Sequence, residues 1–439
     1  MCNYGTVSCV PITESSMEAQ ITSTFSGYQK LVVAILALTQ FTVVLDFMIM
    51  SPLGDILMKS LQLTPAQFGL AVSAYAFSAG LSGILTAGFS DRFDRKKLLL
   101  FFYIGFIGGT VLCGISHTYW FLVAARIITG LFGGVIGSIS MAIVADLFAL
   151  QQRGRVLGFV QMAFGASQVL GIPIGLYMAN GWGWEAPFWM VAALGAVITV
   201  AIAFYIRPIN AHLSVRSERS AFGHLWHTLA QRDYRTGFMA TALLSVGGFM
   251  MMPFGSAFAI NNLHITEQQL PLLFMVTGVS TLVIMPLIGR LSDRADKYRL
   301  FVIASIWMMV ICVWYTHLSV TPLWAAMALN ILMMAGVTGR MVPSSALVSA
   351  VPALKDRGAF MSINASLQQL AGGIAAAVAG RIVVQESNFS PLENYNVVGY
   401  VVVAVSILGL FLMYRVDRLV KRDPSPVEPL TQQTVATND

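Results

Sequence analysis

Long apolar runs dominate this sequence and limit what it can fold into. Only 10% of its 439 residues are charged and 56% are hydrophobic, whereas a soluble domain carries about 25% charged residues. A helix needs about 20 apolar residues to cross the hydrocarbon core of a bilayer. Runs of this kind lie at 30–53, 67–89, 98–116, 119–144, 155–179, 184–206, 236–260, 269–289, 299–317, 322–347, 358–384 and 396–414. We therefore expect an all-α membrane protein with twelve transmembrane helices.

The apolar runs form two similar groups of six. Residues 90–98 read S-D-R-F-D-R-K-K-L and residues 292–300 read S-D-R-A-D-K-Y-R-L, each after the second run of its group. Such a parallel repeat predicts two six-helix bundles related by a pseudo-two-fold axis along the membrane normal, with a substrate site between them. The predicted segments are a tail at 1–28, bundles at 29–206 and 236–415, a basic linker at 207–235 and a tail at 416–439.

The positions of Lys and Arg predict the orientation. Loops on one side of the predicted membrane contain Arg92, Arg95, Lys96, Lys97, Arg153, Arg155, the bases of 207–235, Arg290, Arg294, Lys297, Arg299, Lys355, Arg357, Arg415, Arg418, Lys421 and Arg422. The other side offers only Lys59 and Arg381. Because cytoplasmic loops carry the excess of bases, we expect both termini in the cytoplasm and a multi-pass protein of the inner or plasma membrane.

Several function classes find no support in the sequence. The net charge of +6 comes from bases between apolar runs, so it predicts membrane topology and no nucleic-acid binding. The four cysteines are scattered, which predicts neither a metal site nor a disulfide framework. A Gly-rich phosphate loop is absent from the sequence, as is a nucleophile constellation. We expect no cofactor, no metal and no enzymatic activity.

Asp46 is the main candidate for chemistry because it lies well inside the first apolar run. An ionised carboxylate there costs about 2.5–3.5 kcal/mol on insertion scales, so it needs a cationic partner or a proton. Arg126, in the fourth run, lies at a matching depth of about 10 Å below the outer surface, at 1.5 Å per residue. The pair predicts proton coupling; the alternative is a permanent structural ion pair. Asp55, Asp146 and Glu185 lie near run ends, where water is available.

Three motifs resemble those of the major facilitator superfamily, and most closely its twelve-helix drug:proton antiporter branch. The loop motif reads A-G-F-S-D-R-F-D-R-K-K at 87–97, with Ala87 and Asp94 where the family has glycines, and G-R-L-S-D-R-A-D-K from Gly289. The fourth run contains A-A-R-I-I-T-G-L-F-G-G from Ala124, and the fifth contains G-I-P-I-G at 171–175, with one extra Ile before the proline. Asp tolerates left-handed backbone, so we expect Asp94 to form the turn in place of glycine.

The resemblance implies roles for the loop motif and for the fourth helix. Asp91 is expected to face the start of the eleventh helix, near Gly358, and Arg95 to pair with Asp146. Together with Arg92, these residues and the second-half counterparts Asp293 and Arg294 form a predicted cytoplasmic gate. The alternative for the basic residues is that they only set the orientation of the protein in the membrane. The resemblance also implies that the first and fourth helices meet beside the central cavity.

Polar residues inside the fifth, tenth and eleventh runs are candidates for substrate contact. Gln161 and Gln168 are seven apart, and Asn364 and Gln368 four apart, so each pair is expected on one helix face. Hydrogen bonding between helices is the alternative. Arg340 is expected either to attract an anionic substrate or to extend to the inner interface.

The fifth-run motif contributes Gly171, Pro173 and Gly175, which are expected to permit close helix packing.

The resemblance implies a secondary active transporter that works as a monomer by alternating access. The favoured form is a proton-coupled antiporter that exports a small amphipathic compound, with protons, the substrate and the lipid bilayer as partners. One alternative is uptake or facilitated transport of a polar metabolite or organic anion, with Arg126 and Arg340 as charge partners. An alternative of another class is a non-transporting membrane receptor or scaffold.

Overall fold

The computed structural model describes residues 25–87, 93–148, 150–210, 221–353 and 356–422. These parts of the chain are helical, apart from connections and one isolated β-bridge between Val384 and Glu393. The first half contains α2 (Gly27–Ile49), α3 (Gly54–Leu61), α4 (Pro65–Ala87), α5 (Arg95–Gly114), α6 (Tyr119–Leu147), α7 (Leu150–Ala166), η2 (Ser167–Gly171), α8 (Ile172–Trp182) and α9 (Ala186–Tyr205). The second half contains α10 (Ala221–Ala230), α11 (Arg232–Met251), η4 (Met252–Phe254), α12 (Gly255–Asn261), α13 (Leu270–Arg294), α14 (Lys297–Thr316), α15 (Leu323–Ser349), α16 (Arg357–Ile382) and α17 (Tyr395–Arg422).

Within these described parts, 11 helices are long and apolar enough to cross a membrane. The helix α16 has 26 residues, enough to cross as well, but the polar side chains between Ser362 and Gln369 lower its hydropathy. Each of the twelve predicted runs therefore corresponds to a long helix. Many large apolar side chains remain exposed on the outer surface of the bundle, including Phe204, Ile303 and Leu408. Such a surface is stable against acyl chains and would aggregate in water.

Two of the spanning helices are interrupted. In the fifth, α7 and α8 are joined by the π-helical turn η2, which ends two residues before Pro173. Proline lacks an N–H and its ring clashes with the carbonyl four residues earlier, so a wide turn accommodates it. In the seventh, α11 and α12 are joined by the 3₁₀ turn η4, which contains Pro253. Both interruptions occur where helices of the two halves meet.

The two halves pack against each other chiefly through two helix pairs, α4 with α16 and α8 with α13, and also through α3 with α12. At Gly69 of α4, a methyl group would lie 2.7 Å from the carbonyl oxygen of Ala376 on α16. At Gly278 of α13, it would lie 2.9 Å from the carbonyl oxygen of Gln168 in η2. Both interfaces therefore need glycine, because the backbones approach too closely for a side chain. The division into bundles at 29–206 and 236–415 stays a prediction.

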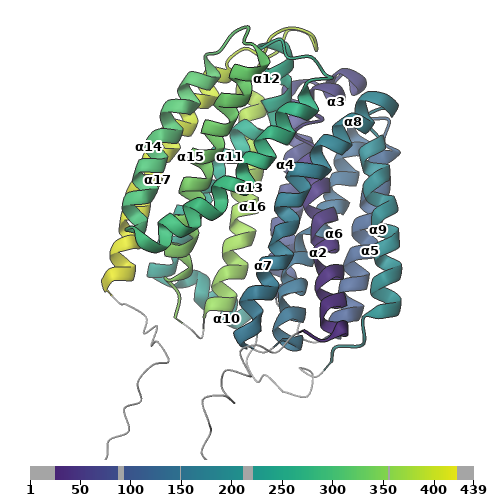
Figure 1. Cartoon of the computed structure of the whole chain (residues 1–439), viewed down its shortest axis with the longest axis vertical. Coiled ribbons are helices and arrows are strands. Elements are labelled where there is room, and N and C mark those ends of the chain that lie inside the picture. Colours follow the sequence, from purple (N-terminus) through teal and green to yellow (C-terminus); the bar gives the residue numbers. More distant parts are fainter. Residues whose placement is uncertain (1–24, 88–92, 149, 211–220, 354–355, 423–439) are drawn as a thin grey trace, which may run out of the picture.

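The helix α2 begins, and α17 ends, at the same end of the bundle, the lower end in Figure 1. We call this the terminus end, and the other, where α3 and α12 lie, the opposite end. The predicted basic linker is partly helical, because α10 occupies 221–230 and α11 begins at Arg232. The last helix also continues past the predicted start of the tail, to Arg422.

The expectation of a left-handed residue at Asp94 is wrong. Asp94 has φ −57° and ψ 128°, and its side chain accepts a hydrogen bond from the Lys97 N–H at the start of α5. In the repeat, Asp296 does the same for the Arg299 N–H at the start of α14. Aspartate is a favoured N-cap, because its carboxylate satisfies an otherwise unpaired N–H of the first turn. The aspartates of the two motifs thus act as helix caps.

Candidate functional site

Asp46 and Arg126 form a fully buried ion pair inside the first half. Arg126 Nη1 on α6 lies 2.9 Å from Asp46 Oδ2 on α2, and neither residue has measurable exposure. The two side chains meet because α2 and α6 run in opposite directions and place them at the same depth. The predicted contact is therefore present, and its role in proton coupling stays a prediction.

Two further helices complete the surroundings of the pair. The Thr110 hydroxyl on α5 donates a hydrogen bond of 3.1 Å to Asp46 Oδ1. The Arg126 guanidinium lies over the Tyr75 ring of α4, with 4.6 Å between them. A guanidinium is attracted to the face of an aromatic ring, more strongly where water is excluded. Among the described residues, Arg126 Nε has no hydrogen-bond partner.

This arrangement links the charge of Asp46 to the packing of four helices. Removing one partner of a buried ion pair costs about 3–5 kcal/mol, because the other charge is left uncompensated in a low dielectric. A proton on Asp46 has the same electrostatic effect as removing its charge. The charge on Asp46 therefore contributes to the packing of these helices.

At the opposite end, a second polar cluster joins the two halves. Asp55 on α3 is almost completely buried and forms an ion pair of 2.7 Å with Lys59. Asn261 on α12 donates a hydrogen bond of 2.6 Å to Asp55 Oδ1. Lys59 also lies 3.5 Å from Glu267, between α12 and α13. Burial raises the pKa of the Asp55 carboxyl above its usual value, while Lys59 and Asn261 oppose this shift.

Further hydrogen bonds join the halves at this end. Asn180 donates one of 2.9 Å to the Glu267 carbonyl, and Ser256 donates one of 2.7 Å to the Ser51 carbonyl. Asn388 donates one of 2.9 Å to the Met58 carbonyl. In this structure the halves are therefore tied together at the opposite end.

The predicted cytoplasmic gate is described in part. Arg95 Nε lies 3.2 Å from Asp146 Oδ2, as the resemblance implied. Asp91 and Arg92 lie outside the described residues. Asp293 and Arg294 are exposed in the last turn of α13. The gate as a whole stays a prediction.

The predicted substrate-contact residues lie in different surroundings. Gln161 lines a cavity of about 80 Å³ together with Gln40 and Ser140. Gln168 lies beyond the start of the π-turn, with its amide 4.0 Å from Met48 Sδ. The shared face of Gln161 and Gln168 stays a prediction.

Arg340 is buried against α14, where Nη1 lies 3.7 Å from Met308 Sδ and the guanidinium faces the Phe301 ring. It therefore does not extend to the interface. In the described chain, its Nε has no hydrogen-bond partner.

On α16, Asn364 is buried with Oδ1 lacking a described partner, and Gln368 is half-buried. Substrate contact by any of these residues stays a prediction.

The glycines of the fifth-run motif allow close packing against α2. A methyl group at Gly171 would lie 2.6 Å from Leu45 Cδ1, and one at Gly175 would lie 2.7 Å from Ile49 Cδ1. Pro173 lies between them at the start of α8. The motif thus packs next to Asp46 on the same helix α2.

Comparison with known proteins identifies the family. A model described as "Major Facilitator Superfamily" matches residues 36–255 and 237–437. The chain belongs to this superfamily. It is therefore a multi-pass membrane protein and a secondary transporter of a small molecule, and the expectation that it is no enzyme is confirmed. The resemblance drawn from the three motifs is also confirmed.

Relatives within the Major Facilitator Superfamily have varied names. "Uncharacterized MFS-type transporter YbcL" of Bacillus subtilis (strain 168) is 24% identical over 87% of this chain and 95% of its own. "Multidrug resistance protein 3" of the same organism is 33% identical over 35% of this chain and 29% of its own. "Vacuolar membrane amino acid uptake transporter fnx2" of Schizosaccharomyces pombe is 34% identical over 34% of this chain, which spans only 26% of that relative.

Solved structures share the fold. A bacterial homologue of the human lysosomal transporter Spinster, in an inward-facing and unoccupied conformation, has a TM-score of 0.70 at 16% identity. That match covers 91% of this chain and 99% of the other. The D-xylose-proton symporter has a TM-score of 0.70 at 17% identity, covering 88% and 98%. The predicted all-helical architecture is thereby confirmed.

Sequence reasoning missed several residues of these clusters. Thr110 and Tyr75 are ordinary residues of apolar runs, and only the packing of α4 and α5 reveals that they contact the ion pair. Asp55 was assigned to a water-accessible run end, but α12 covers it. Its spacing of four residues from Lys59 was the available signal, because such a pair faces the same side of a helix.

Proposed function

We propose that this protein is a proton-coupled antiporter that exports a small amphipathic compound. The observation that carries the proposal is the buried Asp46–Arg126 pair, with its carboxylate held by Thr110. Protonation of Asp46 removes the compensating charge from Arg126 and disfavours this packing of α2 against α6. A ligand shifts a conformational equilibrium only if it binds the two states with different affinity. In this proposal, the proton binds Asp46 more weakly in the arrangement where Asp46 pairs with Arg126 than in the arrangement where the pair is broken.

The proposed cycle alternates between two arrangements of the halves. The arrangement described here is tied at the opposite end by the Asp55 cluster. In the proposed cycle the substrate therefore enters from the terminus end while this tie is in place. With the excess of Lys and Arg at the terminus end, we assign that end to the cytoplasm and this arrangement to the inward-facing state. Binding of an amphipathic compound in one arrangement and of a proton in the other yields exchange.

An apolar, adaptable substrate pocket fits the composition of the central helices. Met48 on α2 and Met251 on α11 are half-buried in the core, and methionine adapts its shape to different ligands. Relatives named multidrug resistance proteins support export of this kind of compound.

Everted membrane vesicles containing the protein provide the test. With a respiration-driven proton gradient, ethidium and other amphipathic cations should dissipate the gradient in wild-type vesicles, as seen in acridine fluorescence. The variant Asp46→Asn should lose this response and keep ethidium binding. The matched control Glu185→Gln, an acid-to-amide change at the half-buried start of α9, should behave as wild type. Unchanged gradient-driven exchange in Asp46→Asn would remove the coupling role.

Arg340 favours a second candidate function, transport of an organic anion. Its guanidinium is buried beside a thioether and an aromatic ring, and the described residues give its Nε no partner. A buried charge needs a counter-charge, which an anionic substrate would supply. Substrate-induced alkalinisation of the medium, abolished in Arg340→Gln, would indicate anion–proton symport in place of antiport.

A further inference from the structure

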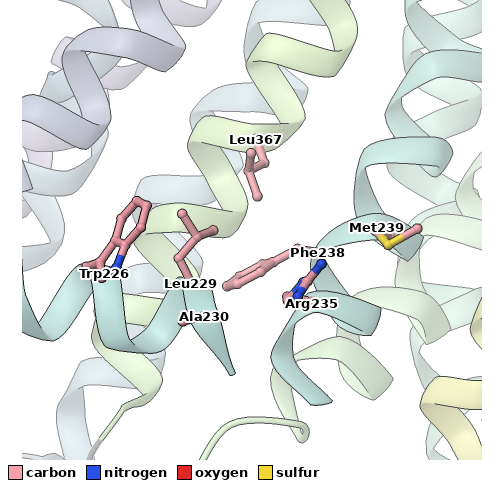
Figure 2. A pocket seen from close by; sticks show the side chains of 7 residues that line it. All are labelled: Trp226, Leu229, Ala230, Arg235, Phe238, Met239 and Leu367. Atoms are coloured by element: carbon pink, nitrogen blue, oxygen red, sulfur yellow. The ribbon is translucent and has the colours of Figure 1, made fainter. Parts of the chain in front are cut away.

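A groove at the terminus end lies apart from the clusters described above. It has a volume of about 410 Å³ and is lined by Trp226, Leu229 and Ala230 of α10, by Arg235, Phe238 and Met239 of α11, and by Leu367 of α16. Figure 2 shows Trp226 and Leu229 on one side and Phe238 and Arg235 on the other, with Leu367 above them.

The groove is formed by α10 and the first turns of α11, which are joined by a sharp bend. Trp226, Leu229 and Ala230 have the spacing i, i+3, i+4, which puts them on one face of α10. Arg235, Phe238 and Met239 repeat this spacing on α11. Only Gln231, in extended conformation, separates the two helices, so the chain turns sharply between them. The two faces therefore open toward each other.

The lining is apolar and open to the surroundings. Trp226 is 73% exposed and Met239 is 56% exposed. Leu229 is exposed as well, whereas Phe238 is buried by stacking on Phe360 of α16. In a membrane protein, exposed apolar side chains are in contact with lipid, and tryptophan is enriched at the headgroup level. A short amphipathic helix at this level lies along the interface with its apolar face toward the acyl chains.

The lining contains one charged group, and it is a cation. Arg235 is exposed, and none of the described carboxylates forms an ion pair with it. In the sequence, the segment 207–235, which includes α10, contains five arginines and only two acids, Glu218 and Asp233. A juxtamembrane basic segment attracts anionic lipid, by about 1 kcal/mol for each base near the surface.

We propose that this groove binds an anionic phospholipid. An acyl chain lies between Trp226 and Phe238, below Leu367, and the lipid phosphate accepts hydrogen bonds from the Arg235 guanidinium. Guanidinium groups suit phosphate because they present paired N–H donors. The bound lipid fixes the angle between α10 and α11, and through Leu367 and Phe360 it contacts α16. This proposal is independent of proton coupling at Asp46.

The first experiment measures lipid binding to the purified full-length protein in detergent by native mass spectrometry. Dioleoylphosphatidylglycerol should bind about fivefold more tightly than dioleoylphosphatidylcholine, which corresponds to one base near an anionic headgroup. In Arg235→Gln this preference should disappear. The matched control is Arg232→Gln, an exposed arginine one turn earlier that does not line the groove, and it should keep the preference. Equal binding of the two lipids, or equal loss in both variants, would overturn the proposal.

The second experiment locates the acyl chain and does not depend on the stability of the arginine variants. Phosphatidylglycerol with brominated acyl chains should quench the fluorescence of the wild-type protein more than that of Trp226→Phe. Equal quenching would show that the lipid lies elsewhere. Displacement of the brominated lipid by ethidium at concentrations that support its transport would assign the groove to the transport path, which also overturns the proposal.

Discussion

The buried pair of Asp46 and Arg126 allows a sharp prediction about stability. The substitution Asp46→Asn keeps the shape of the side chain and an oxygen for the hydrogen bond from Thr110, but it removes the charge 2.9 Å from Arg126 Nη1. Arg126 is fully buried, so water does not replace the lost partner. Breaking a buried ion pair in this way costs about 3–5 kcal/mol. We expect Asp46→Asn and Arg126→Met each to destabilise the protein by this amount.

The double variant Asp46→Asn/Arg126→Met should be much less destabilised than the sum of the two. It leaves no buried charge, and apolar replacement of a buried ion pair is often neutral or stabilising. We expect it within about 1 kcal/mol of the wild type. Because the single costs sum to about 6–10 kcal/mol, the coupling energy in a double-mutant cycle should be about 5 kcal/mol or more.

Reversible unfolding of the purified protein in mixed micelles, followed by circular dichroism at pH 7, measures these free energies. Glu185→Gln serves as the control and should change stability by less than about 1 kcal/mol, since Glu185 makes no side-chain cap and is half-buried. Additivity of the two single substitutions within about 0.5 kcal/mol would refute the reasoning, because independent sites behave in this way.

Three further predictions concern the contacts between halves and the helix caps. Because burial raises the pKa of Asp55 in the tied arrangement, protonated Asp55 stabilises that arrangement at low pH, and this stabilisation is lost as the pH rises through the raised pKa. Distances between spin labels across the opposite end should therefore increase with pH in the wild type and increase less in Asp55→Asn. An equal increase in both proteins would contradict this prediction. Gly69→Ala should lower the free energy of unfolding by about 1–3 kcal/mol in the same assay, because the added methyl group would lie 2.7 Å from a backbone oxygen. Gly248→Ala, which has open space around it, should raise that free energy by roughly 0.5–1 kcal/mol. Equal effects of the two substitutions would argue against the close contact at Gly69. Asp94→Ala should cost about 1 kcal/mol and speed hydrogen exchange at the Lys97 amide; unchanged exchange there would exclude the cap.

The sequence by itself determined the number and order of the membrane-spanning helices. Twelve apolar runs must become helices, because only helices and closed barrels satisfy every backbone hydrogen bond in hydrocarbon. It also determined that Asp46 needs a partner, since a lone carboxylate in a membrane is costly. Depth matching along two antiparallel helices, together with the family resemblance that places the first and fourth helices side by side, selected Arg126.

Tertiary structure decided which residues surround that pair and how the halves meet. Nothing in the pattern of apolar runs distinguishes Thr110 or Tyr75 from their neighbours, because helix rotation and packing set the face that each presents. Asp55 became buried only because a residue from the other half, Asn261, covers it. Contacts between residues 206 positions apart depend on how helices assemble, whereas the helices themselves depend on local hydrophobicity.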